Sequence, residues 1–372
     1  MRVAGLVKAL AEMYDVTVIE LTDPGCEQDG HDGSSCPSVP FIRIPKARGS
    51  GALRHFVHWQ PRVGRSLVDK RAFRRITASL DIVRPRVVLF THSYLAAVVP
   101  FPATNVVVDF PNIETRRFAS LASRASIVNR ISARWEGMKA LVWEPRVARL
   151  CDLAVAMSES DAAWLRARGA NAVVVPNGAE PATRRSSSPP KGPITFVSSA
   201  TYGPNRDAGM HLLKKVWPRV RSLAPEATLC LVGRGTEEHF GWAARMPGVE
   251  IAGEVSSVIP FLEQASIIVA PVSTGGGQQL KIVEALAQGR VMVVSPYSLD
   301  SVPLAARIGC MVASGPEEFA RASAHLFSNV DDRHRMEAAL AGAGELIPTW
   351  RQACVPLAAA LPLSSARPEW SR

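Results

Sequence analysis

The sequence lacks the cysteine spacings of disulfide-rich scaffolds and of zinc sites. Its six cysteines are scattered over 372 residues, with no CxxC pair and no histidine at a metal-ligand spacing. We therefore expect reduced thiols, as in a cytosolic protein, and neither a metal site nor a disulfide framework. Cys26 and Cys36 lie in one Gly- and Ser-rich loop, where two solvated thiols are favoured over a pair.

Long hydrophobic runs are also absent. No segment approaches the roughly 20 apolar residues that a membrane helix needs, and the run at 353–363 is interrupted by Pro356 and Pro362. The start of the chain is an amphipathic stretch containing Lys8 and Glu12, which is unlike a signal peptide. The sequence thus predicts a cytoplasmic protein.

Negative charge is scarce in one part of the chain. The net charge is +10, and residues 40–150 hold 20 Lys and Arg against six Asp and Glu, whereas residues 192–372 are balanced. Such a region suggests an anionic partner, for example a membrane surface, a phospholipid or a polyprenyl phosphate. The alternative is a solvated arginine-rich surface. Residues 43–75 include Phe56 and Trp59 but no nucleic-acid-binding pattern, so we expect peripheral contact with the inner face of an anionic membrane and no nucleic acid.

The sequence does contain alternating strand and helix patterns, most clearly in its second half. Apolar, β-branched runs typical of buried parallel strands lie at 194–198, 228–232, 249–252, 267–271 and 291–295. Helical patterns lie between them at 207–223, 254–264 and 278–288. This order predicts a parallel sheet covered on both faces.

The first half alternates less clearly. It has strand patterns at 16–21, 87–90, 106–108, 153–157 and 172–175, and helical patterns at 4–13, 53–80 and 159–168. Residues 127–150 predict basic helices broken at Pro145, and residues 176–193 have no apolar periodicity, which indicates a linker. We predict an N-terminal domain at 1–180, a linker at 181–192, a C-terminal domain at 193–345 and a final helix and tail at 346–372.

Residues suited to an anionic ligand follow the strands of the second half. Ligands of open parallel sheets bind beyond the carboxyl ends of the strands. There, Gly275, Gly276 and Gly277 precede a helix, whose free N–H groups favour phosphate. Lys281 and Glu284 share one face of that helix and suit a diphosphate and sugar hydroxyls. The alternative is an ordinary glycine turn with an ion pair on a surface helix.

Neighbouring strand ends carry further candidates, which favours the ligand site over the surface turn. The polar or glycine residues that follow the first three strands of this half are Ser199, Thr201, Asn205, Gly233, Gly253 and, next to them, Val255.

Five stretches of the second half match a known family in order and spacing. They are VVVPNGAE (173–180), FVSSATYGPNRDA (196–208), LCLVGRG (229–235), VEIAGEVSSVIPFLEQASIIVAP (249–271) and GGGQQLKIVEALAQGRVMVVS (275–295). Together they resemble the donor domain of the retaining, metal-independent glycosyltransferases of family four, with the GT-B fold. The resemblance implies an α/β protein with two facing Rossmann-like domains, an acceptor side in 1–180 and a donor site in 193–345.

The resemblance also assigns roles to the candidate residues. It places Glu284 at the ribose or sugar hydroxyls, and Lys281 with the 275–277 loop at the diphosphate. It places the 253–255 loop at the base of the nucleotide. It implies no cofactor besides the nucleotide-sugar substrate and no metal. Gln278 belongs to the stretch beside the transferred sugar.

Two departures from the family pattern bear on activity. Many members carry a sugar-contacting glutamate eight positions before the one matched by Glu284, where this chain has Gly276. Members also open with a hydrophobic strand and a glycine loop, whereas this sequence begins at the helix that follows them. Either Met1 is a misassigned start, or the first strand of the N-terminal domain is missing.

In the first half, VVVDFPNIETRRF (106–118) and LVWEPRVARLCDLAVAMSESDAAWL (141–165) also resemble family stretches. The resemblance places Asp109, Asn112 and Glu114 on the acceptor side, with His92 at another strand end. No catalytic residue is assigned, because in retaining transfer the leaving phosphate can itself deprotonate the acceptor. The alternatives are a partly buried structural histidine for His92, and helix capping or a buried ion pair for Asp109 and Glu114.

The sequence therefore predicts a glycosyltransferase that moves a sugar, with retention, from a nucleotide-diphosphate sugar to a lipid, glycan or small-molecule acceptor. One alternative is a truncated, non-catalytic relative that acts as a binding or scaffold protein. The absent first strand and Gly276 favour this alternative. A nucleotide-sugar epimerase of the same architecture is a second alternative, and the order of the motifs disfavours it.

Overall fold

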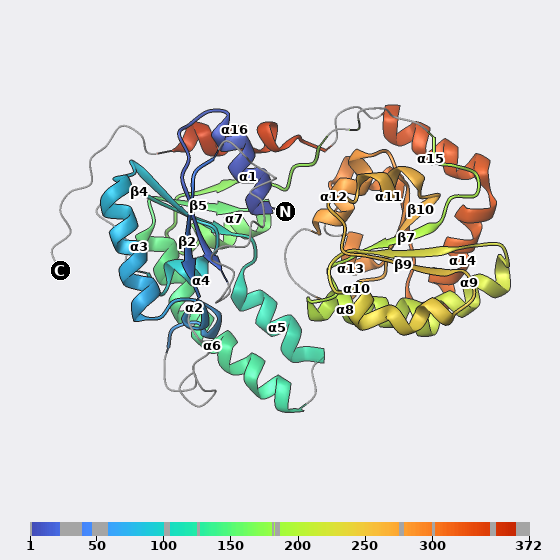
Figure 1. Cartoon of the computed structure of the whole chain (residues 1–372), viewed down its shortest axis with the longest axis horizontal. Coiled ribbons are helices and arrows are strands. Elements are labelled where there is room, and N and C mark those ends of the chain that lie inside the picture. The colour runs from blue at the N-terminus through green and yellow to red at the C-terminus, as the bar shows by residue number, and fades with distance from the viewer. Residues whose placement is uncertain are drawn as a thin grey trace. The chain divides into compact units, whose positions relative to one another are not determined.

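The computed structural model describes residues 2–22, 39–46, 59–99, 105–124, 127–180, 182, 187–274, 279–299, 302–342 and 347–361. The chain divides into two compact units (Figure 1): an N-terminal unit of residues 1–177 and 350–372, and a C-terminal unit of residues 178–349. This division differs from the predicted domains at both ends of the C-terminal unit. Residues 187–193 fold onto the C-terminal unit, and the final helix, α16 (Trp350–Ala360), belongs to the N-terminal unit.

The C-terminal unit contains a six-stranded parallel sheet in the order β12-β11-β10-β7-β8-β9. The strands are β7 (Ile194–Val197), β8 (Leu229–Val232), β9 (Val249–Gly253), β10 (Ile267–Ala270), β11 (Met292–Val294) and β12 (Cys310–Val312). All residues of β7, β8, β10 and β11 are buried, which is why these strands are near-continuous apolar runs in the sequence. The predicted parallel sheet is confirmed.

Helices cover both faces of this sheet. After β7 come α8 (Gly203–His211), a π-helical turn (Leu212–Val216) and α9 (Trp217–Leu223), where the sequence predicts one helix. The remaining helical segments are α10 (Thr236–Phe240), a 3-10 turn (Gly241–Arg245), α11 (Ile259–Gln264), α12 (Leu280–Ala287), α13 (Pro296–Leu299), a 3-10 turn (Leu304–Gly309), α14 (Gly315–Ser328) and α15 (Val330–Gly342). Neighbouring strand residues belong to different cores: Phe196 packs with Leu213 and Trp217, whereas Val197 packs with Ile282.

The N-terminal unit has two parallel sheets among its described residues. One is a pair, β1 (Val18–Thr22) and β2 (Phe41–Pro45), and the other has the order β3-β4-β5-β6. Those four are β3 (Val87–Phe90), β4 (Asn105–Phe110), β5 (Leu153–Ala156) and β6 (Ala172–Val174). Both sheets contribute to one core, in which Ile44 of β2 packs with Val106 and Val108 of β4.

Eight helices of the N-terminal unit lie in its described part. They are α1 (Arg2–Ala11), α2 (Arg62–Leu67), α3 (Lys70–Val83), α4 (Ser93–Ala96), α5 (Glu114–Arg124), α6 (Ile127–Leu150), α7 (Glu159–Arg166) and α16. The prediction of a break at Pro145 is wrong, because α6 continues through it. Trp143, Val147 and Ala148 pack on the same core, which stabilises the helix on both sides of the proline despite the hydrogen bond that proline removes.

Two further sequence predictions concern the thiols and the membrane. Cys26 and Cys36 lie outside the described residues, and the four described cysteines (Cys151, Cys230, Cys310 and Cys354) are free thiols. Within the described part of the chain, no helix has both the length and the apolar composition to cross a bilayer.

Candidate functional site

The strand order of the C-terminal unit reverses between β7 and β10. From β7 the chain proceeds outward to β8 and β9, and from β10 it proceeds the other way to β11 and β12. The helices after these two central strands cover opposite faces, since Leu213 after β7 and Ile282 after β10 belong to different cores. Their connections therefore diverge at the carboxyl edge, and such a reversal is where open α/β sheets bind ligands.

A hydrogen bond joins the segments that follow β7 and β10 at this reversal. Lys281 Nζ on α12 donates to Asn205 Oδ1 on α8 at 2.8 Å. Asn205 Nδ2 donates to the carbonyl oxygen of Ser199 at 3.1 Å, and the hydroxyls of Ser199 and Thr201 lie 2.9 Å apart. The structure thus connects four residues that the sequence singles out.

Lys281 is partly buried, and among the described residues it is not part of an ordinary surface ion pair. Its ammonium lies 5.5 Å from the centre of the Phe196 ring. Burial lowers the pKa of Lys281 to about 7, because removal from water disfavours the charged form. Its described hydrogen-bond partner is the neutral amide of Asn205 and not Glu284. No carboxylate among the described residues pairs with this ammonium, so an incoming anion would stabilise its charge.

Glu284 lies one turn further along α12. Its Oε2 is buried and has no hydrogen-bond partner among the described residues. Burial raises the pKa of Glu284 to about 7. A buried acceptor without a donor costs on the order of 1–3 kcal/mol, and a ligand hydroxyl that donates to it would remove this cost.

Glycines hold the ends of β7, β8 and β9 close together. Gly233 has φ +128°, and a Cβ there would lie 2.1 Å from the carbonyl oxygen of Ser198, so a side chain has no room. Gly233 N donates to the carbonyl of Gly253 at 2.7 Å. Gly253 has φ +73°, and a Cβ there would lie 2.5 Å from Glu237 Oε1. Gly233 thus allows a close approach of two backbones, whereas Gly253 leaves room for the side chain of Glu237. Val255 beyond them is partly buried against the core.

The glycine loop before α12 is not among the described residues. Gly275, Gly276, Gly277 and Gln278 all lie outside them. The next residue, Gln279, is fixed, because its Nε2 donates to Ser298 Oγ at 3.0 Å.

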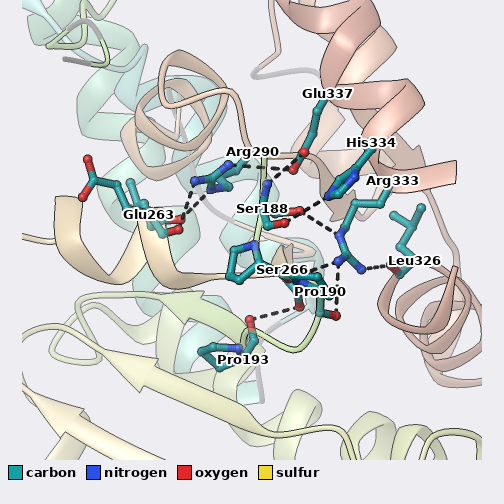
Figure 2. Close-up of polar contacts among 12 residues, drawn as sticks. Ser188, Pro190, Pro193, Glu263, Ser266, Arg290, Leu326, Arg333, His334 and Glu337 are labelled. Carbon is teal, nitrogen blue, oxygen red and sulfur yellow. Dashed lines mark hydrogen bonds and ion pairs between the residues drawn. The ribbon is translucent and has the colours of Figure 1, made fainter. Parts of the chain in front are cut away.

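The far end of α12 is anchored by a buried arginine (Figure 2). Arg290, three residues beyond the helix, is 1% exposed. It donates from Nε to the carbonyl of Leu262 at 2.9 Å and from Nη2 to the carbonyl of Glu263 at 3.0 Å. Its Nη1 lies 3.8 Å from Glu337 Oε1 on α15.

A second buried arginine, Arg333 on α15, holds the segment that leads into β7. Arg333 Nε donates to Ser188 Oγ at 2.8 Å, and its Nη2 donates to the carbonyl of Pro189 at 3.1 Å. Ser188 N in turn donates to Glu337 Oε2 at 3.0 Å. Figure 2 shows these contacts as one chain, in which Arg290 contacts Glu337, Glu337 contacts Ser188 and Ser188 contacts Arg333. One network therefore fixes the approach to β7 and the exit from α12. The sequence gives no signal for this network, because its members lie far apart in the chain.

On the predicted acceptor side, Asp109 forms a buried ion pair. Its side chain is 1% exposed, and its Oδ2 and Oδ1 accept from Nε and Nη2 of Arg2 at 2.9 and 2.8 Å. Arg2 also donates to Asn177 Oδ1 at 3.0 Å. The ion-pair alternative is therefore what the structure shows for Asp109, and sequence reasoning missed Arg2.

Glu114 is also ion-paired, at the start of α5. Its Oε2 accepts from Arg117 Nε at 2.9 Å, and its backbone N–H donates to Glu144 Oε1 at 2.6 Å. Glu144 also accepts from Thr115 N at 3.0 Å. Just before the helix, Asn112 Oδ1 is buried without a hydrogen-bond partner among the described residues.

His92 precedes α4 and stacks on Tyr94, with ring centres 4.6 Å apart. Burial is the main cause that lowers the pKa of His92, with a smaller opposing effect from Asp109. Partly buried and with a lowered pKa, this histidine has the features of the structural alternative.

Comparison with known proteins classifies part of the chain. Residues 192–329, which contain the β7–β10 site, match the family described as "Glycosyl transferases group 1". These residues are a group 1 glycosyltransferase domain. No curated protein matches the sequence significantly.

Solved structures similar to the chain extend the comparison beyond the glycosyltransferase domain. Sucrose-phosphate synthase from Thermosynechococcus elongatus superposes with a TM-score of 0.65 at 13% identity, covering 95% of this chain and 90% of its own. HepE from Anabaena, solved with UDP, gives 0.63 at 13% identity with 96% of both chains covered. WaaG, a glycosyltransferase involved in lipopolysaccharide biosynthesis, gives 0.60 at 12% identity, covering 96% and 93%. At these identities the likeness shows the fold alone, and it confirms the predicted GT-B architecture.

Proposed function

We propose that this chain is a retaining glycosyltransferase that transfers a sugar from a nucleoside-diphosphate sugar to a lipid, glycan or small-molecule acceptor. One observation carries the proposal. In a glycosyltransferase domain, Lys281 meets Asn205 at the reversal of the strand order, where a diphosphate would lie between the segments after β7 and β10.

Each group of the site has a role in binding the donor. The ammonium of Lys281 would donate a hydrogen bond to a phosphate oxygen of the donor, in addition to or in place of its bond to Asn205. The 275–278 loop would lie beside the same phosphates. Glu284 would accept hydrogen bonds from ribose or sugar hydroxyls through its buried oxygen. The hydroxyls of Ser199 and Thr201 offer further donors, and the 253–255 loop would face the base.

The chemistry proposed for the site follows from retention of configuration. The bond between C1 of the sugar and the phosphate oxygen breaks as the acceptor oxygen bonds to C1 on the same face. The acceptor proton passes to the departing phosphate oxygen, so no protein base is needed. In line with this, both carboxylate oxygens of Asp109 are occupied by Arg2, and Glu114 is paired with Arg117.

We propose a uridine nucleotide as the first donor class to test. HepE from Anabaena has been solved with UDP and with UDP-glucose, and its fold spans both units of this chain. Calorimetric titration of the full chain with UDP, GDP and ADP would identify the nucleotide.

Lys281→Met should weaken binding of the preferred nucleotide about 10- to 100-fold, because hydrogen bonds to charged groups contribute about 1.5–3 kcal/mol. Lys215→Met removes an exposed lysine of the same unit and should leave affinity unchanged. Equal affinity of both variants would show that the nucleotide binds elsewhere.

Transfer itself is tested by mass spectrometry with sugar nucleotides and a panel of lipid, glycan and small-molecule acceptors. Product formation or donor hydrolysis supports the enzyme. Nucleotide binding without either outcome would favour the non-catalytic alternative, and absence of nucleotide binding would overturn the proposal.

A further inference from the structure

The outward face of α6 in the N-terminal unit carries charge of one sign only. Four arginines of this helix are exposed: Arg130, Arg134, Arg146 and Arg149. Both glutamates of α6 are buried on its inner side. Glu144 caps α5, and Glu136 pairs with Lys139 at 2.6 Å. Among the described residues of α6, every exposed charge is therefore positive.

The same face exposes large apolar side chains. Ile131 is 62% exposed, Met138 48%, Leu141 54% and Val142 54%. Spacings of seven and four residues place Ile131, Met138 and Val142 along one stripe, with Leu141 beside it. Isolated exposed apolar residues are common, but a stripe on a single helix is a surface that a partner covers.

An exposed tryptophan extends this apolar stripe. Trp59 is 58% exposed, and its ring lies 5.9 Å from that of Trp135 on α6. The chain just after it is tied to α6, because Arg62 N donates to Glu136 Oε2 at 3.1 Å. Tryptophan combines an apolar ring with a polar N–H, which suits the boundary between lipid tails and water.

We propose that the outward face of α6, together with Trp59, docks the protein on an anionic phospholipid bilayer, with the helix lying in the plane of the interface. An apolar stripe flanked by arginines and free of exposed acids is the pattern of such interfacial helices. A solvated basic surface would account for the arginines but not for the apolar stripe. A second copy packed face to face would bring like charges together, which is unfavourable.

Co-sedimentation of the full chain with vesicles tests this proposal. We expect binding to vesicles containing phosphatidylglycerol, little binding to pure phosphatidylcholine, and release at high salt. Each arginine near an anionic surface changes partitioning about fivefold, so Arg134→Gln with Arg146→Gln should weaken binding about 25-fold. Met138→Glu with Val142→Glu should weaken it at least about tenfold.

A matched control separates this face from net charge. Ile82→Glu with Val355→Glu makes the same charge change at two residues of the same unit that are 81% and 56% exposed on α3 and α16. This control should leave vesicle binding within about twofold of the unaltered protein, with all variants matched for melting temperature.

Equal losses in the control and α6 variants would overturn the proposal. So would equal binding to neutral vesicles, absence of vesicle binding, or a change of oligomeric state in the α6 variants. None of these measurements involves a sugar nucleotide, so their outcome is independent of the proposed transferase activity.

Discussion

Lys281 and Glu284 lie one turn apart on α12, and burial shifts their pKa values toward each other, to about 7 in both. Without a ligand, each group tends toward its neutral form near neutral pH. A diphosphate beside Lys281 would restore its positive charge, so donor binding and proton uptake at this lysine are linked.

This linkage gives a pH dependence of a definite sign. Because the pKa of Lys281 is lowered to about 7, the free protein loses the ammonium as pH rises through 7. Affinity for UDP-glucose should then fall by up to about tenfold per pH unit between pH 7.5 and 9. UDP-glucose suits the test because its diphosphate diester keeps a constant charge over this range. Calorimetric titrations in buffers of different ionisation enthalpy would measure the number of protons that the protein takes up on binding UDP-glucose.

Lys281→Met is the reference for this prediction. It should bind more weakly but with nearly flat affinity over the same pH range, because the titrating cation is gone. If the affinity of the variant fell equally steeply above pH 7.5, the titration would belong to another group.

At the scale of elements, the extent of burial decides which strands can be recognised from the sequence. β7, β8 and β10 were predicted because strands buried on both faces consist of nearly continuous apolar residues. β2 and β12 were missed because they are short and mostly not fully buried, so neither apolar run is continuous. The break predicted at Pro145 does not occur, because the tertiary packing of α6 overrides the local preference of proline.

Some residues of the candidate site are likewise predictable from the sequence, and others are not. Lys281 and Asn205 were predicted because both follow strand ends, which can be recognised locally in the sequence. In a parallel sheet these ends lie at one edge, which brings the two residues together. Arg2 could not be predicted, because its pairing with Asp109 joins positions 107 residues apart. The Arg290 and Arg333 network likewise depends on tertiary contacts that no sequence period encodes.

Arg333 allows a test of how α15 holds the segment before β7. Arg333→Met would leave several buried carbonyls without donors, among them those of Leu326 and Pro189, and should destabilise the protein by about 3–5 kcal/mol. Arg335→Met, two residues on, removes an exposed arginine paired with Asp332 at the surface and should cost less than about 1 kcal/mol. Urea unfolding measures both, and similar costs would contradict the anchoring role.

At the scale of the molecule, the chain returns to its first unit at its end. Trp350 of α16 packs against α1, where a Cβ at Gly5 would lie 2.1 Å from the indole. The C-terminal unit is instead one continuous segment with its own two cores. Each unit has the internal packing of an independently folding domain, so one melting temperature need not describe both.

Calorimetry should therefore resolve two unfolding transitions that respond to different changes. At 100 times its Kd, UDP stabilises the unit that binds it by about 2.7 kcal/mol, which for a unit of this size raises its transition by roughly 5–10 °C. That transition should be the one that Lys281→Met makes insensitive to UDP.

Trp350→Ala removes a buried indole from the N-terminal unit and should lower the other transition, at a cost of about 3–5 kcal/mol. A single transition moved by both UDP and Trp350→Ala would instead mean that the two units unfold as one, because only coupled units transmit a ligand's stabilisation to each other.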